Sequence, residues 1–270
     1  MSAALSDPII SPSTALIGAG AWFAEKIFGP SAEAIGDQLK VYLQSRLPKI
    51  FGVADSKARA EQLSVQPIKP GLLARMVMNA SLSDDDAEIT DWWANLFVDA
   101  SCRVANEHVV FDEMMAMLGP KEVQLLDRLL ADYLYVLDDI DDAGRRNLSS
   151  PEIILDYAIS NAVGPLPVSS DGRALMVSGL SKLNLTWPTW ALFWSIPIRQ
   201  DDGAISSPTT RGQVSTEDPL TLQILERAGL LERRRTVVAD NELSGWVSTI
   251  NVTLIGLEFY RACTGRRLGK

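Results

Sequence analysis

The sequence predicts a mainly α-helical protein, in which a multi-helix domain is followed by a C-terminal winged-helix-like α/β module containing a small β-hairpin. Two observations lead to this fold class. Up to about residue 160, apolar residues recur at the three- and four-residue spacing of an amphipathic helix. After residue 218, a helical pattern is followed by two segments rich in β-branched residues and a last helical pattern. With 270 residues, 47% of them hydrophobic, the chain can form one large domain or two small ones.

We divide the chain into three predicted parts. These are an N-terminal helical hairpin and connector (1–64), a central helical domain (65–200) and the winged-helix-like module (218–270). The connector, 55–64, is polar and either helical or irregular, and the two prolines of the following VQPIKPGLL exclude a helix there. The polar segment 200–217 contains Gly and Pro and is predicted to be a mobile loop.

The N-terminal hairpin has two interpretations. Its first predicted helix, 14–28, is rich in Gly and Ala, and its second begins at Ser31 and ends before Pro48. The small residues allow close helix packing, which favours a structural hairpin. Alternatively, the exposed side chains of Trp22, Phe23, Ile27 and Phe28 enter a lipid headgroup region, with Trp22 and Phe23 as the main membrane contacts.

The central domain is organised around SLSDDDAEITDWWANLFVDAS (81–101). We expect Ser83 to cap a helix and Asp84–Asp86 to fill its first turn, where carboxylates meet unpaired N–H groups. Trp92 and Trp93 lie on the apolar stripe of this helix, so both should be buried. Removing either indole from a packed position should cost roughly 3–5 kcal/mol, so this stretch is scaffold.

Further helices are predicted on both sides of this stretch. One short helix lies near 72–78, one begins just after His108, and one covers 121–137. Ser150 is expected to cap another helix, and the pattern over 174–183 is also helical.

The stretch LTWPTWALFW contains three tryptophans at helical spacing. If Pro188 opens a helix, then Trp187, Trp190 and Trp194 lie along one side of it. Such a stripe is either packed in the core or forms a surface for a partner or ligand.

The C-terminal segment has a clear order of elements. A helix begins at Asp218, followed by Pro, and stops at Gly229. Two strands, 233–239 and 246–252, are predicted to form a hairpin, and 254–263 is a closing helix. Helix, hairpin and closing helix together are the outline of a winged helix.

Three consecutive arginines, Arg233, Arg234 and Arg235, begin the predicted hairpin. They are candidate contacts to nucleic acid or to a partner. The alternative, which we prefer, is a solvated basic strand end that balances Glu226 and Glu232.

The charge of the chain limits its partners. The net charge is −9. Residues 218–270 carry eight Lys/Arg and six Asp/Glu (+2), which leaves seventeen and twenty-eight (−11) for the rest. A general nucleic-acid binder is therefore disfavoured, and DNA binding is expected only through the C-terminal module.

The sequence begins without a secretory pattern and two cysteines give no disulfide framework, so we expect a cytoplasmic protein, or one peripheral to the membrane.

No reaction chemistry is evident. The single histidine, His108, would have to carry any Ser-His-Asp or Cys-His arrangement, and a multi-histidine metal site is impossible. We expect His108 to cap or pack at a helix start, with a hydrolase built on it as the remaining alternative. Gly18 and Gly20 lack the third glycine of a dinucleotide motif. We therefore expect no enzyme activity, and no catalytic, cofactor or metal site.

Several short motifs follow one another in order along the chain. They are PIKP, SDDDAEI, WWANLF, His108 to Phe111, MLGPKEVQLLDRL, then Ala228-Gly229-Leu230-Leu231, and finally Thr253, Gly256, Phe259 and Ala262-Cys263. This order resembles the abortive infection alpha (Abi-alpha) family, long catalogued as a domain of unknown function. The tryptophan-rich stretch 187–194 departs from the family pattern.

The resemblance implies a bacterial cytoplasmic protein associated with defence against phage and without established enzymatic activity. It would act through an unknown protein partner or phage component, or at a membrane surface. The alternative is a DNA-binding regulator that uses the winged helix. The trigger, the target and the oligomeric state stay open.

Overall fold

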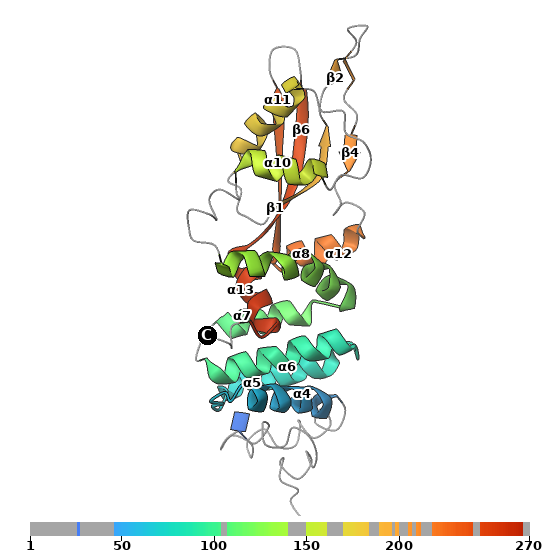
Figure 1. The fold of residues 1–270 in the computed structure, drawn as a ribbon. Helices are drawn as coiled ribbons and strands as arrows, with labels where there is room; N and C mark the ends of the chain where they lie inside the picture. The colour runs from blue at the N-terminus through green and yellow to red at the C-terminus, as the bar shows by residue number, and fades with distance from the viewer. Residues whose placement is uncertain are drawn as a thin grey trace, which may run out of the picture. The chain divides into compact units, whose positions relative to one another are not determined.

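The computed structural model confirms a mainly α-helical protein (Figure 1). It describes residues 26–27, 46–103, 107–139, 150–160, 170–183, 189–195, 198–199, 205–206, 209–211, 218–239 and 244–266. The chain forms two compact units. The first, here called the helical unit, comprises Met1–Val123 and Glu258–Lys270, and the second, the sheet unit, comprises Gln124–Leu257.

The helical unit consists of packed helices. They are α4 (Leu47–Ala60), α5 (Pro70–Leu82), α6 (Ala87–Cys102), α7 (Glu107–Ala116), the beginning of α8 (Pro120–Asp139) and the last turns of α13 (Leu254–Cys263). α6 packs against α4 and α7, and α5 packs against α7. Before α5, the N–H of Ile68 donates to the carbonyl of Ile27 at 3.1 Å, and Ile27 is fully buried, not exposed as the membrane interpretation expects.

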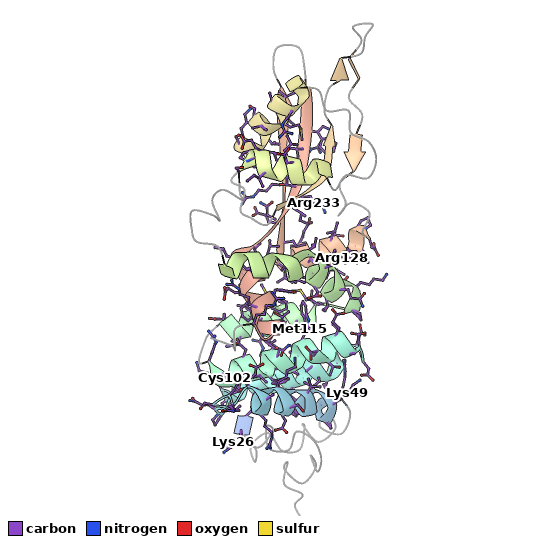
Figure 2. All side chains as sticks on the ribbon, viewed as in Figure 1. Lys26, Lys49, Cys102, Met115, Arg128 and Arg233 are labelled. Carbon is purple, nitrogen blue, oxygen red and sulfur yellow. The ribbon has the colours of Figure 1, made fainter. Side chains whose placement is uncertain are left out.

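Helix α6 forms the core of the helical unit. Every residue from Ile89 to Ser101 except Asp91 is buried, as expected for a helix surrounded by others. Both predicted indoles, Trp92 and Trp93, are in this core, which confirms their scaffold role. The fully buried Met115 of α7 belongs to the same core (Figure 2).

The sheet unit contains a four-stranded antiparallel sheet in the order β4-β1-β6-β5. Its strands are β1 (Thr189–Ser195), β4 (Thr209–Arg211), β5 (Leu231–Ala239) and β6 (Ser244–Val252), and β2 (Ile198–Arg199) pairs separately with β3 (Ile205–Ser206). Helices α10 (Pro151–Ser160) and α11 (Ser170–Ser181) lie side by side over the sheet (Figure 1). α12 (Pro219–Arg227) packs against β5.

The C-terminal elements agree with the sequence. Asp218 caps α12 by accepting a hydrogen bond from the N–H of Leu220 at 3.0 Å. The hairpin β5–β6 and the closing helix α13 form as predicted. The sequence did not show that this hairpin continues into a larger sheet through β1.

The second helix of the predicted hairpin falls on residues that the structure does not describe, and a further helix, α4, follows it. α4 begins at Leu47 with Pro48 in its first turn and runs through much of the predicted connector. Proline fits there because the first N–H groups of a helix have no intrahelical partner.

The prediction that Ser83 caps α6 is wrong. Asp86, not Ser83, caps the helix, because Asp86 Oδ1 accepts hydrogen bonds from the N–H groups of Glu88 at 2.8 Å and Ile89 at 3.2 Å. Ser83 instead follows α5 and donates its hydroxyl to the carbonyl of Ala80 at 2.8 Å. Both side chains are good caps, so local propensity did not decide between them.

The helix predicted from Pro188 is wrong as well, because Thr189–Ser195 form strand β1. A short run of aromatic and apolar residues suits either element, and pairing with β6 on one side and β4 on the other selects the strand. The loop predicted over 200–217 contains the short strands β3 and β4.

Candidate functional site

Two of the short motifs interlock at the start of α13. Gly229 has a positive φ of 73°, which suits the turn between α12 and β5. Thr253 Oγ1 donates a hydrogen bond to the Gly229 carbonyl at 2.6 Å and accepts one from the N–H of Gly256 at 2.9 Å. The N–H of Thr253 donates to the Leu230 carbonyl at 3.1 Å. Thr253 therefore caps α13 and fastens it to the preceding turn.

The glycine of the second motif permits this close approach. A Cβ atom at Gly256 would lie 2.3 Å from the carbonyl oxygen of Leu230. The motif requires glycine because the two backbones approach too closely for any side chain.

The other end of α13 lies in the core of the helical unit. The ring of Phe259 packs edge-to-face on Trp92 and Phe111, with centroid distances of 6.1 and 5.7 Å, and Tyr260 packs on Trp92 at 5.6 Å. The amide Nδ2 of Asn95 donates to the carbonyl of Cys263 at 2.7 Å. This bond satisfies one of the carbonyls that a helix leaves unpaired at its C-terminus.

The single histidine is buried in a polar pair between α6 and α7. His108 Nε2 lies 2.9 Å from Asp99 Oδ2, and Arg103 Nε lies 3.3 Å from Asp99 Oδ1. The His108 ring also packs edge-to-face on Phe111 at a centroid distance of 6.1 Å. Because His108 and Asp99 are fully buried, the pair joins two helices and offers no accessible base.

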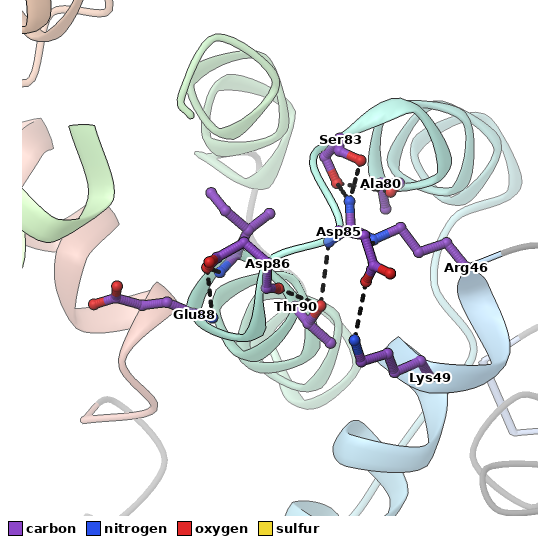
Figure 3. Close-up of polar contacts among 9 residues, drawn as sticks. Arg46, Lys49, Ala80, Ser83, Asp85, Asp86, Glu88 and Thr90 are labelled. Carbon is purple, nitrogen blue, oxygen red and sulfur yellow. Dashed lines mark hydrogen bonds and ion pairs between the residues drawn. The ribbon is translucent and has the colours of Figure 1, made fainter. Parts of the chain in front are cut away.

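A second cluster surrounds Arg46, which is only 8% exposed (Figure 3). Its guanidinium donates through Nη1 to the carbonyl and hydroxyl of Ser83, and through Nη2 to Thr90 Oγ1 at 3.2 Å. Beside it, Lys49 Nζ lies 2.9 Å from Asp85 Oδ1. The cluster places a cation at the C-terminus of α5, where the helix dipole is negative, and ties α5 to α6.

The ionisable groups of this cluster respond to their surroundings. The hydrogen bond and charge of Lys49 hold the pKa of Asp85 below its usual value. Burial lowers the pKa of Arg46, although the neighbouring aspartates oppose this change. The arrangement is that of a helix junction.

A third cluster joins α5 to α7. Asp112 is fully buried and accepts a hydrogen bond from Asn79 Nδ2 at 3.0 Å. Arg75 Nη2 lies 3.2 Å from Asp112 Oδ2 and 2.8 Å from Glu113 Oε1. Burial raises the pKa of Asp112 despite these partners. All three clusters hold helices together.

A family model described as "Abortive infection alpha" matches residues 43–263. The chain belongs to the abortive infection alpha family. No curated protein and no solved structure matches the chain. The family name implies defence against phage by abortive infection, which agrees with the resemblance found in the sequence.

The aromatic residues that were predicted as contacts lie in different parts of the chain. Trp22 and Phe23 lie outside the matched range and outside the residues that the structure describes, so their membrane contact stays a prediction. Trp187 lies outside the described residues too. Trp190 and Trp194 lie on β1, where they pair with Ile250 and Val247 of β6, so these two residues do not lie on a helix.

The three arginines are on strand β5. Figure 2 labels the first of them, Arg233. Arg233 Nε lies 2.7 Å from Glu226 Oε1, and Arg234 Nη2 lies 2.9 Å from Glu232 Oε2. These are the two acids expected from the sequence to balance the strand end. Arg235 lies over the ring of Trp246, with its guanidinium carbon 4.5 Å from the centroid. Contact with nucleic acid or a partner stays a prediction for these residues.

The described residues contain no group of three or more His, Cys, Asp or Glu side chains that could hold a metal ion. Burial raises the pKa of the Cys102 thiol and raises that of Cys263 strongly, which makes both poor nucleophiles. No helix in the described part of the chain is long and apolar enough to cross a membrane.

Sequence reasoning missed the polar residues that join the helices. Asn95 and Asp99 lie three and seven residues after Trp92, on the apolar stripe of α6, and this spacing could have identified them as buried polar groups. Arg46 gave no such signal, because it lies just before α4 and reaches α5 and α6 only in the folded chain.

Proposed function

We propose that this protein is a non-enzymatic effector of abortive infection that acts by binding a protein or a membrane surface. Membership of the abortive infection alpha family over residues 43–263 carries the proposal. The family name supplies the biological process, and the non-enzymatic mechanism is our extension.

The role of the family motifs supports a binding mechanism. Thr253 and Gly256 fasten α13, Trp92 fills the core, and His108 is buried against Asp99. An accessible nucleophile or base would favour a catalytic function, whereas these residues have evident structural roles. Because these motif residues serve the fold, we take the surface of the protein as the simpler candidate for its function, and binding as the simpler hypothesis.

The test is survival after phage challenge. Host cells that express the protein are compared with empty-vector cells at low and high multiplicity of infection, with equal expression checked by immunoblot. We expect protection of the culture at low multiplicity and collapse at high multiplicity. Absence of protection against a broad phage panel would contradict the proposal.

A variant of the single histidine tests the non-enzymatic mechanism. In His108→Gln, the side-chain amide can still donate to Asp99 Oδ2, while the imidazole base is lost. We expect full protection from a variant that retains the wild-type circular dichroism spectrum. A correctly folded variant that fails to protect would favour the hydrolase alternative.

A flotation experiment distinguishes the two proposed targets, a membrane surface and a protein partner. If the target is a membrane, the purified protein should float with anionic liposomes, and Trp22→Ala with Phe23→Ala should stop it from floating. If no lipid mixture carries the protein upward, the membrane version fails and a protein partner is left.

A further inference from the structure

We propose that the outer edge of β5 binds an acidic, extended peptide, which adds to the sheet as a further strand. The inference rests on the proposed function and specifies the chemistry of the protein partner. Strand addition of this kind uses main-chain hydrogen bonds for affinity and side chains for selection.

The first observation is that β5 is the end strand of the sheet. Among the described strands it pairs only with β6, so one side of its backbone faces away from the sheet. All side chains from Glu232 to Val237 are exposed or half-buried, and Val237 is 66% exposed. An edge strand of this length presents unpaired N–H and C=O groups to an incoming chain.

The second observation is the charge along this edge. Successive side chains alternate between the faces of a sheet, so Arg233 and Arg235 project on one face and Arg234 on the other. Glu226 and Glu232 pair with Arg233 and Arg234, whereas Arg235 has no carboxylate partner in the described part of the chain and lies on Trp246. Arg235 is therefore the cation of this edge that no carboxylate balances among the described residues, and it lies on the face that it shares with Arg233.

The same charges disfavour a second copy as the added strand. In an antiparallel β5–β5 pair centred on Arg234, Arg233 of each copy would lie opposite Arg235 of the other. Like charges directly opposite one another destabilise a strand pair. A strand with glutamate or aspartate at alternating positions reverses the sign of this interaction, which selects an acidic partner.

Binding is measured by fluorescence anisotropy with the full-length protein. The probe is a labelled peptide as long as β5 with alternating glutamate and valine. One control peptide replaces glutamate with lysine, and another carries N-methyl groups on alternate backbone amides, which removes strand pairing but keeps the charge. We expect the acidic peptide to bind and both control peptides to fail.

Two variants with the same charge change locate the site. Arg235→Glu is expected to weaken binding by roughly three- to tenfold, since an opposite-charge cross-strand pair becomes a like-charge pair. Arg227→Glu, at an exposed position in the last turn of α12, should bind as the wild type does. Matching circular dichroism spectra and thermal midpoints show that both variants are folded.

Three outcomes would overturn the inference. They are absence of binding by the acidic peptide, equal binding by the N-methylated peptide, and equal weakening by the two variants. Labelled duplex DNA is tested in parallel at low salt, and DNA binding that depends on Arg235 without peptide binding would favour the regulator instead. Phage protection without peptide binding would remove this inference alone and leave the proposed function standing.

Discussion

Replacing Gly256 with alanine should destabilise the fold, although alanine is the better helix former by about 1 kcal/mol. The new Cβ atom would lie 2.3 Å from the Leu230 carbonyl oxygen and 3.0 Å from Leu230 C and Cα. These are backbone atoms next to β5, so they cannot rotate away as a flexible side chain could. The start of α13 would have to move away from Leu230.

The magnitude follows from what this movement costs. Overpacking costs roughly 1–3 kcal/mol, and weakening the two hydrogen bonds from Thr253 to the Gly229 and Leu230 carbonyls costs about 1 kcal/mol each. The helix propensity of alanine offsets about 1 kcal/mol of this. We expect a net loss of about 2–4 kcal/mol in the free energy of unfolding.

Urea unfolding, followed by tryptophan fluorescence and circular dichroism, measures this loss. Gly71→Ala is the matched control, because a Cβ atom at that position in the first turn of α5 meets nothing within 4 Å. The control should be unchanged or more stable by up to about 1 kcal/mol. If Gly256→Ala proves as stable as Gly71→Ala, the close backbone approach does not constrain the fold and the reasoning is refuted.

Three further predictions use the same assay. Asp86→Ala should cost about 1 kcal/mol through loss of the α6 cap, whereas Asp84→Ala, outside the helix, should cost much less; equal costs would contradict the assigned cap. Trp92→Ala should cost roughly 3–5 kcal/mol, and a cost below about 1 kcal/mol would show that its ring contacts to α13 are unimportant. The raised pKa of Asp112 means that the folded state holds its proton more tightly than the unfolded state. Stability relative to Asp112→Asn should therefore increase as pH falls from neutral towards the unfolded-state value near 3.8, and a relative decrease would refute this.

Local sequence signals were sufficient where the structure depends on neighbouring residues. Asp218 and the proline after it mark the start of α12, and Gly229 marks the turn behind it, because caps and turns use groups only a few residues apart. The burial of Trp92 and Trp93 also followed from helical periodicity alone.

Local signals failed where distant contacts decide between alternatives. The stretch around Trp190 becomes a strand because β6, far along the sequence, supplies its partner. Arg46 and Ser83 are brought together from opposite ends of two helices, so neither residue type nor spacing indicated their contact. The arginines of β5 lie between these cases, since their acidic neighbours were visible in the sequence but the sheet edge was not.

The placement of α13 has a consequence for synthesis on the ribosome. The helical unit takes most of its residues from the first part of the chain, yet Phe259, Tyr260 and the Cys263 carbonyl complete its core. The first helices therefore leave the ribosome with Trp92 and Asn95 still lacking these partners. The whole sheet unit is translated before these partners are made. The helical unit therefore reaches its native packing only after residue 263 has emerged.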